Sequence, residues 1–471
     1  MKIGVRSEDK GPWERRTPLV PADAARLRAA GFEVVVQSSA CRAFADAEYR
    51  AAGVPVQESL ADCEVIVGIK EIPPEKIERG KTYLFFPHVI KGQAANMPML
   101  RRILEQGATL VDYERIVDEH NRRLIFFGRH AGLAGMINSL WALGLRLVEE
   151  QIPSPFAALR QARTYADLDA ANEDLRKAAQ TVAAHGVPPA VHPLVVGFTG
   201  TGNVSRGAQE ILDRFPVEEI RPEELLAAGP NRFADPRRIY KTVFAEEDLF
   251  VPNAAGEPFD LADYYRRGAE GYRSVFESFL ARLVVWVNGV YWDARYPRLL
   301  TLEGCRRLWG AGPGPRLRVI GDISCDVKGA VECTLRATDP GDPLYVYEPE
   351  SGAVREGVRG RGPVVMAVDI LPAEIPRESS TDFSRVLSGL LPALAQSDPP
   401  EDFAVWRLPP ELKRAVIAHR GALTPDYAGL AKFLEAEDGA GGKTQGQRAA
   451  GLRIVTITGE KAGLRSSRRR E

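Results

Sequence analysis

The sequence has little of what marks disulfide-rich, metal-binding or nucleic-acid-binding proteins. Its 471 residues contain only five cysteines, and no two of them form a Cys-x-x-Cys pair. This argues against a disulfide framework and against a thiolate metal site. Lysine and arginine total 62 against 63 aspartate and glutamate residues, a formal net charge of -1. No global basic field therefore predicts binding to nucleic acid or to a membrane surface, and we predict no bound metal.

Targeting segments and long hydrophobic runs are also missing from the pattern. The first ten residues, MKIGVRSEDK, lack the apolar stretch of a signal peptide. We find no run of about 18 apolar residues of the kind that spans a membrane. These features favour a cytoplasmic protein without a membrane partner. The length exceeds that of one typical hydrophobic core, so we expect two domains.

Strands and helices alternate from the first residues onward, which is typical of a doubly wound α/β domain. Helices are predicted with a proline in the first turn or a glycine at the end. Buried strands are predicted at residues 2–6, 32–37, 64–70, 81–88, 109–114 and 123–128, and helices at residues 21–31, 46–53, 97–107 and 131–150. Small residues in the last of these helices allow it to approach its neighbours closely.

A second α/β unit begins near residue 193, with further strands predicted at residues 283–292 and 317–324. A helix is predicted at residues 382–396, after Ser379, Ser380 and Thr381, and we expect it to pack back against the first domain. The predicted fold is two Rossmann-like doubly wound domains with a cleft between them. The predicted divisions are a substrate domain of residues 1–130 plus 372–437, a nucleotide-binding domain of residues 131–371, and a flexible tail of residues 438–471.

Three predicted strands of the first domain end in an ionisable side chain: Lys70, His88 and Glu114. The carboxyl ends of parallel strands lie along one edge of a sheet, where ligands bind, so we expect these side chains to share one crevice. A charged residue directly after a buried strand is often only the first residue exposed to solvent. For each of the three residues taken alone, this is the alternative to a functional role. A lysine near a histidine and a carboxylate has a perturbed pKa, which suits proton transfer near neutral pH.

A glycine-rich turn follows the first predicted strand of the second unit, in the segment VVGFTGTGNVSRGAQEIL. Glycines between a strand and a helix allow the backbone to approach a pyrophosphate, and the helix N-terminus binds the anion. The residues expected to bind a dinucleotide here are Gly200, Thr201, Gly202, Asn203, Val204 and Ser205. About 20 residues beyond the strand, Glu218 or Glu219 would bind a ribose 2'-hydroxyl, whereas Arg221 would bind a 2'-phosphate. Spacing alone leaves NAD and NADP both open, and a tight turn without a ligand is the alternative.

Together these motifs resemble one enzyme family, the lysine-2-oxoglutarate reductase half of α-aminoadipic semialdehyde synthase and the lysine-forming saccharopine dehydrogenases. Alanine dehydrogenase and the N-terminal region of transhydrogenase are relatives of this family. The resemblance covers roughly residues 1–430 in family order. The matching stretches are GVRSEDKGPWERRTPLVP, GIKEIPPEKI, KTYLFFPHVIKGQAANMPML, DYERIVD, FGRHAGLAGMINSLWALGLRL, FTGTGNVSRGAQEI, NGVYWDARYPRLLT and DISCDVKGAVECT.

The resemblance implies a two-domain enzyme that condenses lysine with 2-oxoglutarate and reduces the imine to saccharopine, or runs the reverse. It implies an acid–base pair of Lys70 and His88, with Glu114 as the acidic partner that modulates the pair. It also implies substrate binding by Arg16, Lys91 and Arg123. Arginine forks bind carboxylates bidentately, and imine formation needs both a base and an acid, so the chemistry agrees.

Two further segments are similar to cofactor-side elements of this family. Asn288 and Gly289 lie in the segment NGVYW, which resembles the one beside the nicotinamide, and a turn with aromatic packing is the alternative. Asp322 and Asp326 follow another predicted strand, and one of the two is expected to face the active site. The GTGNVS form of the glycine loop resembles that of NADPH users, so NADP(H) is favoured and NAD(H) remains open.

Other functions are compatible with the sequence. One is an alanine-type amino-acid dehydrogenase that releases ammonia, and another is a nucleotide-binding regulatory module without catalysis. The saccharopine-cleaving second half of the bifunctional enzymes has no counterpart in the sequence, so we expect the first step only. The expected partners are small molecules, namely lysine, 2-oxoglutarate and saccharopine, and a homo-oligomer is left open.

Overall fold

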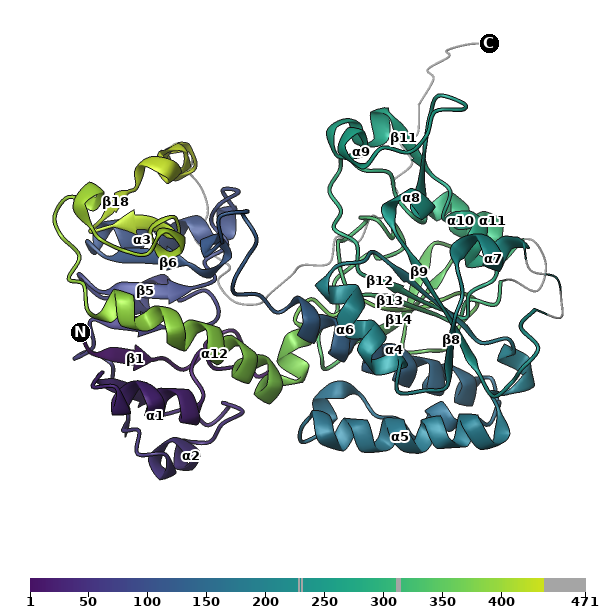
Figure 1. Ribbon diagram of the computed structural model, residues 1–471, viewed down its shortest axis with the longest axis horizontal. Helices are drawn as coiled ribbons and strands as arrows, with labels where there is room; N and C mark the ends of the chain where they lie inside the picture. Colours follow the sequence, from purple (N-terminus) through teal and green to yellow (C-terminus); the bar gives the residue numbers. More distant parts are fainter. Residues whose placement is uncertain (228, 230–231, 311–314, 436–471) are drawn as a thin grey trace, which may run out of the picture.

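The protein consists of two α/β lobes that lie side by side and are joined by long helices (Figure 1). A computed structural model describes residues 1–227, 229, 232–310 and 315–435. The tail predicted at residues 438–471 lies outside the described residues. The predicted class, two Rossmann-like doubly wound domains with the first completed from the C-terminal side, is confirmed.

The first domain is built on an eight-stranded sheet in the order β18-β17-β6-β5-β4-β1-β2-β3. Five of the predicted strands and the short β3, which was not predicted, form its parallel part, and β17 and β18 join by antiparallel pairing at one edge. The strands are β1 (Ile3–Val5), β2 (Val34–Gln37), β3 (Val56–Gln57), β4 (Val65–Val67), β5 (Thr82–Phe85), β6 (Thr109–Asp112), β17 (Val416–His419) and β18 (Ala422–Leu423). The helices of this domain are α1 (Pro21–Ala29), α2 (Asp46–Ala51), α3 (Met97–Glu105), α13 (Pro410–Lys413) and α14 (Ala431–Glu435).

The strand predicted at residues 123–128 is wrong. Arg123 forms only an isolated bridge with Val117, and the remaining residues lead without regular structure into the next helix. The run is apolar because it crosses between the domains: Ile125 is buried in the first core, and the ring of Phe127 stacks 5.0 Å from that of Phe383. An apolar run of this length predicts burial, but it does not distinguish a strand from a buried connection.

The second domain also has eight strands, in the order β15-β14-β16-β13-β12-β7-β9-β8. Its strands are β7 (Val195–Thr199), β8 (Val217–Glu219), β9 (Ile239–Phe244), β12 (Val285–Asn288), β13 (Val319–Asp322), β14 (Leu344–Glu348), β15 (Ala353–Glu356) and β16 (Val364–Met366). The helices are α5 (Leu168–His185), α6 (Asn203–Leu212), α7 (Pro222–Ala227), α8 (Glu246–Leu249), α9 (Leu261–Arg267), α10 (Glu277–Leu280) and α11 (Leu302–Gly310), with a hairpin of β10 (Phe250–Pro252) and β11 (Tyr272–Ser274) above the sheet. Among the described strands of this sheet, β14 alone runs opposite to the others, and it pairs in antiparallel orientation with both β16 and β15.

Helix α4 (Gly128–Glu149) carries the chain into the second domain and packs tightly against α6. A Cβ atom on Gly132 would lie 2.0 Å from the carbonyl oxygen of Val204, and one on Gly207 would lie 2.1 Å from that of Arg129. The small residues predicted to permit close packing therefore do so. By length and hydropathy α4 could cross a membrane, a run that we did not find in the sequence, but 72% of its apolar window is buried inside the protein.

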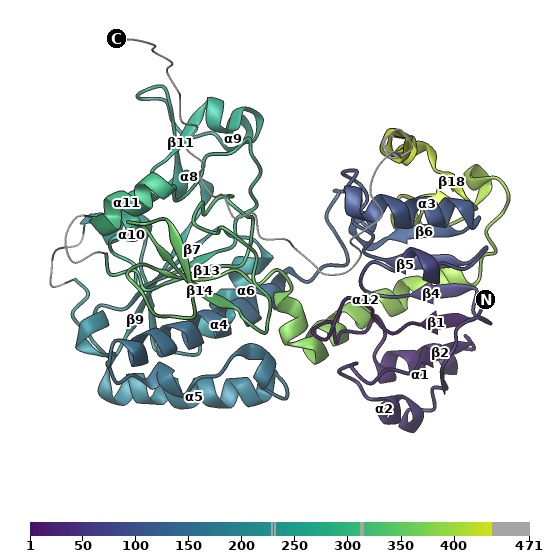
Figure 2. The ribbon, with the colours of Figure 1, turned by 180° about the vertical axis from the view of Figure 1, so that it is seen from behind.

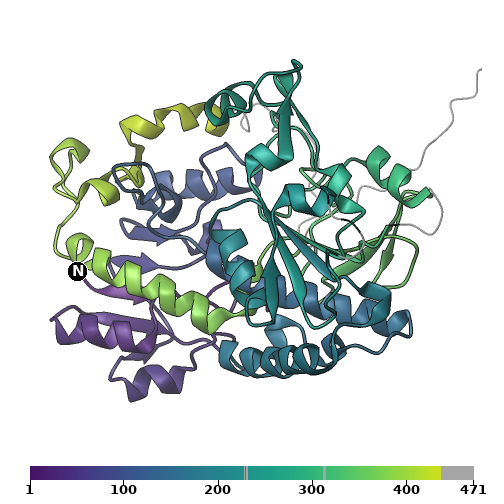
Figure 3. The same cartoon turned by 45° about the vertical axis from the view of Figure 1, so that its right-hand side comes forward.

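Helix α12 (Pro376–Ala395) carries the chain back along the first sheet (Figures 2 and 3). It begins at Pro376 and not after Thr381, because a proline in the first turn needs no hydrogen-bond donor. The serines that we expected before the helix lie within it and face the first domain: the Oγ atom of Ser380 accepts a hydrogen bond of 2.9 Å from the backbone N–H of Thr17. The predicted packing against the first domain is thus confirmed.

Candidate active site in the interdomain cleft

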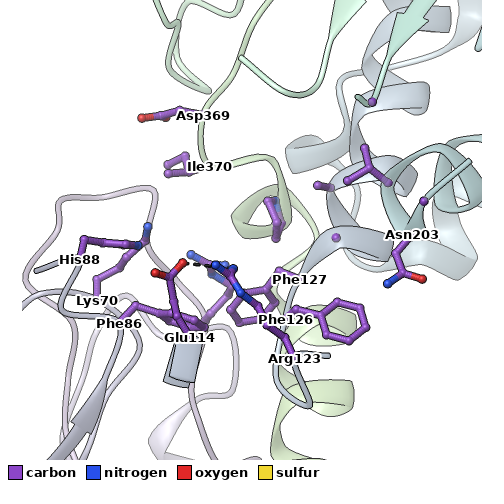
Figure 4. A pocket seen from close by; sticks show the side chains of 17 residues that line it. Lys70, Phe86, His88, Glu114, Arg123, Phe126, Phe127, Asn203, Asp369 and Ile370 are labelled. Carbon is purple, nitrogen blue, oxygen red and sulfur yellow. Dashed lines mark ion pairs between the residues drawn. The ribbon is translucent and has the colours of Figure 1, made fainter. Parts of the chain in front are cut away.

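A cavity of about 480 Å³ lies between the domains and contains most of the predicted site (Figure 4). The first domain contributes Arg16, Lys70, His88, Glu114 and Arg123 to its wall. The second domain contributes Gly202, Asn203, Val204, Gly289 and Asp369. The three strand-end side chains therefore share a crevice, and the glycine-rich turn forms the opposite wall.

Lys70 lies three residues beyond β4, at the carboxyl end of the strand. The carboxylate of Glu8 holds this turn, because it accepts hydrogen bonds from the backbone N–H groups of Ile69 (2.7 Å) and Lys70 (2.9 Å). Burial lowers the pKa of the Lys70 ammonium, and the positive charge of Arg16 lowers it further. A lysine in this environment gives up its proton more readily than one in water.

His88 follows β5 in a left-handed backbone conformation, with φ of 47°. The side-chain amide of Asn96 donates a hydrogen bond of 3.0 Å to its carbonyl oxygen and stabilises the turn. The Nδ1 atom lies 2.7 Å from a carboxylate oxygen of Glu71, which also pairs with Lys10 at 3.0 Å. Burial would raise the pKa of Glu71, but the hydrogen bond and the charge of His88 outweigh it and bring the pKa to about 2.

Sequence reasoning missed Glu71 as the partner of His88. The signal was present, since Glu71 directly follows Lys70 in the stretch GIKE. Adjacent side chains of an extended segment point to opposite faces, so the pattern predicts that Glu71 points away from the site of Lys70. Its position in the sequence therefore did not indicate a contact with His88, which lies 17 residues later. The structure shows that one short turn supplies both the lysine of the cavity and the carboxylate behind the histidine.

Glu114 pairs with Arg123 at 3.1 Å, drawn as the ion pair in Figure 4. Asp112, at the end of β6, accepts a hydrogen bond of 2.8 Å from the backbone N–H of Glu114 and so fixes this turn. Burial raises the pKa of Asp112 to about 7. The carboxylate predicted to modulate the lysine–histidine pair thus has an arginine as its direct partner.

Arg16 is buried and already has a carboxylate partner within its own loop. Its Nε and one terminal nitrogen donate to the two oxygens of Glu14 at 2.8 and 2.5 Å, and its guanidinium lies 4.3 Å from the centre of the Phe127 ring. These contacts hold the side chain rigidly at the cavity. A substrate carboxylate would therefore bind to the donors that Glu14 leaves open.

Lys91 lies in an adjoining cavity of about 290 Å³, which shares Glu114 and Arg123 with the main one. Burial raises the pKa of Asp326, and the positive charge of Lys91 opposes this rise, so the two residues act on each other across the cleft. Asp326 belongs to the wall of neither cavity.

The glycine-rich turn is shaped for close approach of a ligand. Gly200 has φ of 92°, and a Cβ atom there would lie 3.2 Å from the carbonyl oxygen of Gly289. A Cβ atom on Gly202 would meet nothing within 4 Å, so the space in front of the α6 N-terminus is open. A pyrophosphate fits this site, since the first N–H groups of a helix and its dipole attract anions. Ser205 is buried with its hydroxyl bonded to Gln209, and Thr201 does not line the cavity.

Asn288 and Asp322, which we expected to bind the cofactor, point into the protein. The amide of Asn288 accepts a hydrogen bond from Thr199 (2.8 Å) and donates one to Asp322 (2.8 Å). Asp322 also accepts one from Thr334 at 2.5 Å. Both side chains are 1% exposed. This network ties together the carboxyl ends of β7, β12 and β13 beneath the glycine-rich turn.

The strand order changes the expectation for the ribose. Arg221 follows β8 at the sheet edge and pairs with Glu224 (2.8 Å) and Glu223 (3.0 Å). On this side of the sheet the strand that pairs with β7 is β9, and Glu246 follows β9. Glu246 lines a cavity of about 270 Å³ with aromatic residues and accepts a hydrogen bond from Tyr265. We missed Glu246 because the expected spacing of about 20 residues led to β8.

An α/β domain whose ionisable strand ends face the glycine-rich turn of a second α/β domain is the arrangement of the two-domain pyridine-nucleotide-dependent dehydrogenases. Residues 4–134 match the family described as "Alanine dehydrogenase/PNT, N-terminal domain". An L-alanine dehydrogenase structure has the same fold, with a TM-score of 0.58 and 19% identity over 92% of this chain and all of its own.

Sequence relatives extend this similarity over nearly the whole chain. "Alpha-aminoadipic semialdehyde synthase" of Arabidopsis thaliana is 37% identical over 90% of this chain and 41% of its own length. The mitochondrial enzyme of that name from Bos taurus is 34% identical over 95% of this chain and 49% of its own. The chain thus spans less than half the length of these relatives. "Saccharopine dehydrogenase [NAD(+), L-lysine-forming]" of Emericella nidulans is 26% identical over 88% of this chain and 97% of its own. The predicted kinship is confirmed.

Proposed function

We propose that the protein joins L-lysine to 2-oxoglutarate and reduces the resulting imine to saccharopine with a nicotinamide cofactor, or runs the reverse. The observation that carries this proposal is the single cavity that brings Lys70, His88 and two arginines opposite the α6 N-terminus. The relatives support the substrate class, because their names refer to saccharopine and to aminoadipic semialdehyde. In this proposal the first domain binds the substrates and the second binds the cofactor.

The charges of the site suit these substrates. Both carry carboxylates, and Arg16, Arg123 and Lys91 offer cationic donors around two connected cavities. Lys70, with its lowered pKa, is the proposed base that takes a proton from the attacking ammonium. His88, held by Glu71, is the proposed acid that protonates the departing water. The two side chains thus divide the two proton transfers between them.

The bound cofactor would supply the hydride that reduces the imine. Gly202 and the first turn of α6 would hold its pyrophosphate, because Gly202 has no side chain and the space beside it is open. Gly289, in the same cavity wall, would lie beside the nicotinamide. Phe126 and Phe127 cover the neighbouring wall and reduce the access of water to the reacting atoms.

NADP(H), favoured by the resemblance, is our proposed cofactor, with NAD(H) as the alternative. Arg221 is the proposed 2'-phosphate ligand, although it lies beside the edge strand β8. Glu246, after the strand next to β7, favours a ribose 2'-hydroxyl, because a carboxylate repels a phosphate. Measuring kcat/KM for NADPH and NADH with Arg221→Ala and Glu246→Ala decides between them. NADP(H) specificity requires Arg221→Ala to impair NADPH use selectively.

One experiment distinguishes the proposed function from the two alternative functions. An alanine-type dehydrogenase would oxidise the reduced cofactor with pyruvate and ammonia, whereas the proposed enzyme does so with 2-oxoglutarate and lysine. A regulatory module would bind the cofactor and turn over neither pair. Turnover with pyruvate and ammonia alone would refute the substrate assignment, and binding without any turnover would refute catalysis.

A further inference from the structure

Asp369 is a cavity residue to which neither the sequence motifs nor the proposed acid–base chemistry assigns a role. It lies between β16 and the 3₁₀ helix Leu371–Glu374, at the carboxyl end of the second sheet. Figure 4 shows its side chain over the part of the cavity that holds Lys70 and His88. The second domain thus places a carboxylate opposite the acid–base pair of the first.

All other charged groups of the cavity wall except Lys70 have an ion-pair partner among the described residues. Arg16 pairs with Glu14, His88 with Glu71, and Arg123 with Glu114. Among the residues that the structure describes, the Asp369 carboxylate has no cation within ion-pair distance. Burial raises its pKa, and the positive charge of Lys70 across the cavity opposes this rise. Asp369 is accordingly the acid of this wall that is available to a cation from outside.

A lysine-type substrate brings such a cation. Its carboxylate has several cationic donors in the cavity, but its α-ammonium needs an anion, since a buried charge without a partner is costly. We propose that Asp369 binds the α-ammonium group of the amine substrate. This inference rests on the proposed function, and it names the residue that distinguishes lysine from ammonia, which has no second amine.

The α-ammonium fits Asp369 better than the reacting ε-amine does. A nearby carboxylate stabilises the protonated form of an amine, and the ε-amine must lose its proton before it attacks the ketone. The α-ammonium remains charged throughout the reaction, so a permanent ion pair does not oppose catalysis. Lys70, whose pKa is lowered by burial, is the group suited to take the proton from the reacting ε-amine.

A matched removal of the two partners tests the assignment. The wild-type protein and Asp369→Asn are assayed with lysine and with 6-aminohexanoate, which is lysine without its α-amine, together with 2-oxoglutarate and reduced cofactor. We expect Asp369→Asn to lower kcat/KM for lysine by at least about tenfold and to leave the value for 6-aminohexanoate within about twofold. Where 6-aminohexanoate turns over too slowly, its inhibition constant against lysine replaces kcat/KM in the comparison.

The controls separate this role from a structural one. Asp398→Asn removes an exposed carboxylate outside the cavity and should behave as wild type toward both amines. The KM for 2-oxoglutarate and the affinity for the cofactor should be unchanged in Asp369→Asn. Equal loss for both amines, or no loss for lysine, would overturn the proposal. If the wild-type protein turns over no lysine at all, the proposed function itself fails, and the two failures are therefore distinct.

Discussion

The imidazole of His88 and the carboxylate of Glu71 lie 2.7 Å apart, and Glu71 directly follows Lys70 in the chain. One turn after β4 therefore presents an ammonium to the cavity and an anion to the histidine behind it. A carboxylate on Nδ1 fixes the ring so that Nε2 is directed away from Glu71 and is available for proton transfer. The proposed acid–base pair of Lys70 and His88 thus includes a third residue, Glu71, which contacts only His88 of the two.

Glu71→Gln keeps an oxygen near Nδ1 but removes the negative charge. We expect kcat to fall by roughly tenfold or more, because the charge that stabilises the imidazolium is lost. The pH–rate profile should change as well, because the carboxylate that is removed lies 2.7 Å from the imidazole. Glu75→Gln, at an exposed position of the same loop, is the matched control. An unchanged profile would show that Glu71 does not act through His88.

Two glycines of the glycine-rich turn should respond differently to substitution by alanine. At Gly200 the positive φ and the nearby carbonyl of Gly289 predict a loss of roughly 1–3 kcal/mol in unfolding free energy. At Gly202 a Cβ atom has open space, so stability should stay within about 0.5 kcal/mol while cofactor affinity falls. Thermal unfolding and a fluorescence titration with reduced cofactor measure the two effects. Normal affinity in Gly202→Ala would contradict the cofactor placement.

The close contact between α4 and α6 predicts that one added methyl group at this contact strongly lowers the stability of the protein. A Cβ atom on Gly207 would lie 2.1 Å from the carbonyl oxygen of Arg129, so Gly207→Ala must separate the helices. We expect a loss of at least about 2 kcal/mol in the free energy of unfolding. Gly389→Ala, in an exposed position of α12 with nothing within 4 Å, should instead stabilise by up to about 1 kcal/mol. Chemical denaturation that found the two variants equal would refute the tight packing.

The raised pKa of Asp112 predicts that this residue makes the protein less stable as the pH rises. Its pKa in the folded protein is about 7, raised by burial from an ordinary value of 3.8. Between these values the folded state binds more protons than the unfolded state, so this group lowers stability as pH rises. Asp112→Asn should therefore gain stability over wild type by roughly 2–3 kcal/mol between pH 5 and pH 8. A difference that stayed constant over this range would contradict the raised pKa.

The apolar pattern of each strand and the residue that ends it were sufficient to predict the sheet edge that carries Lys70, His88 and Glu114. The continuous apolar runs before these residues fix the strands, and parallel pairing brings their ends together. The glycine-rich turn was equally predictable, because a strand, two glycines and a helix are consecutive in the chain. Local sequence contains all of this information.

Local sequence is not sufficient where distant segments decide the surroundings of a residue. Residues 123–128 are as apolar as a strand, but they form the connection between the domains, in which Ile125 is buried and Phe126 is exposed. Asn288 and Asp322 are the last residues of β12 and β13, and the hydrogen bond between their side chains depends on how these neighbouring strands pack. The order of β8 and β9 is set by tertiary structure, so counting residues led to Arg221 and away from Glu246.

The most direct test of the account is to detect the product. The wild-type protein and Lys70→Met are mixed with lysine, 2-oxoglutarate and reduced NAD(P), and saccharopine is quantified by mass spectrometry alongside a titration of cofactor binding. We predict saccharopine from the wild-type protein, a loss of at least about a hundredfold in Lys70→Met, and cofactor affinity within about twofold of wild type. No saccharopine from the wild-type protein, or equal formation by the variant, would contradict the account.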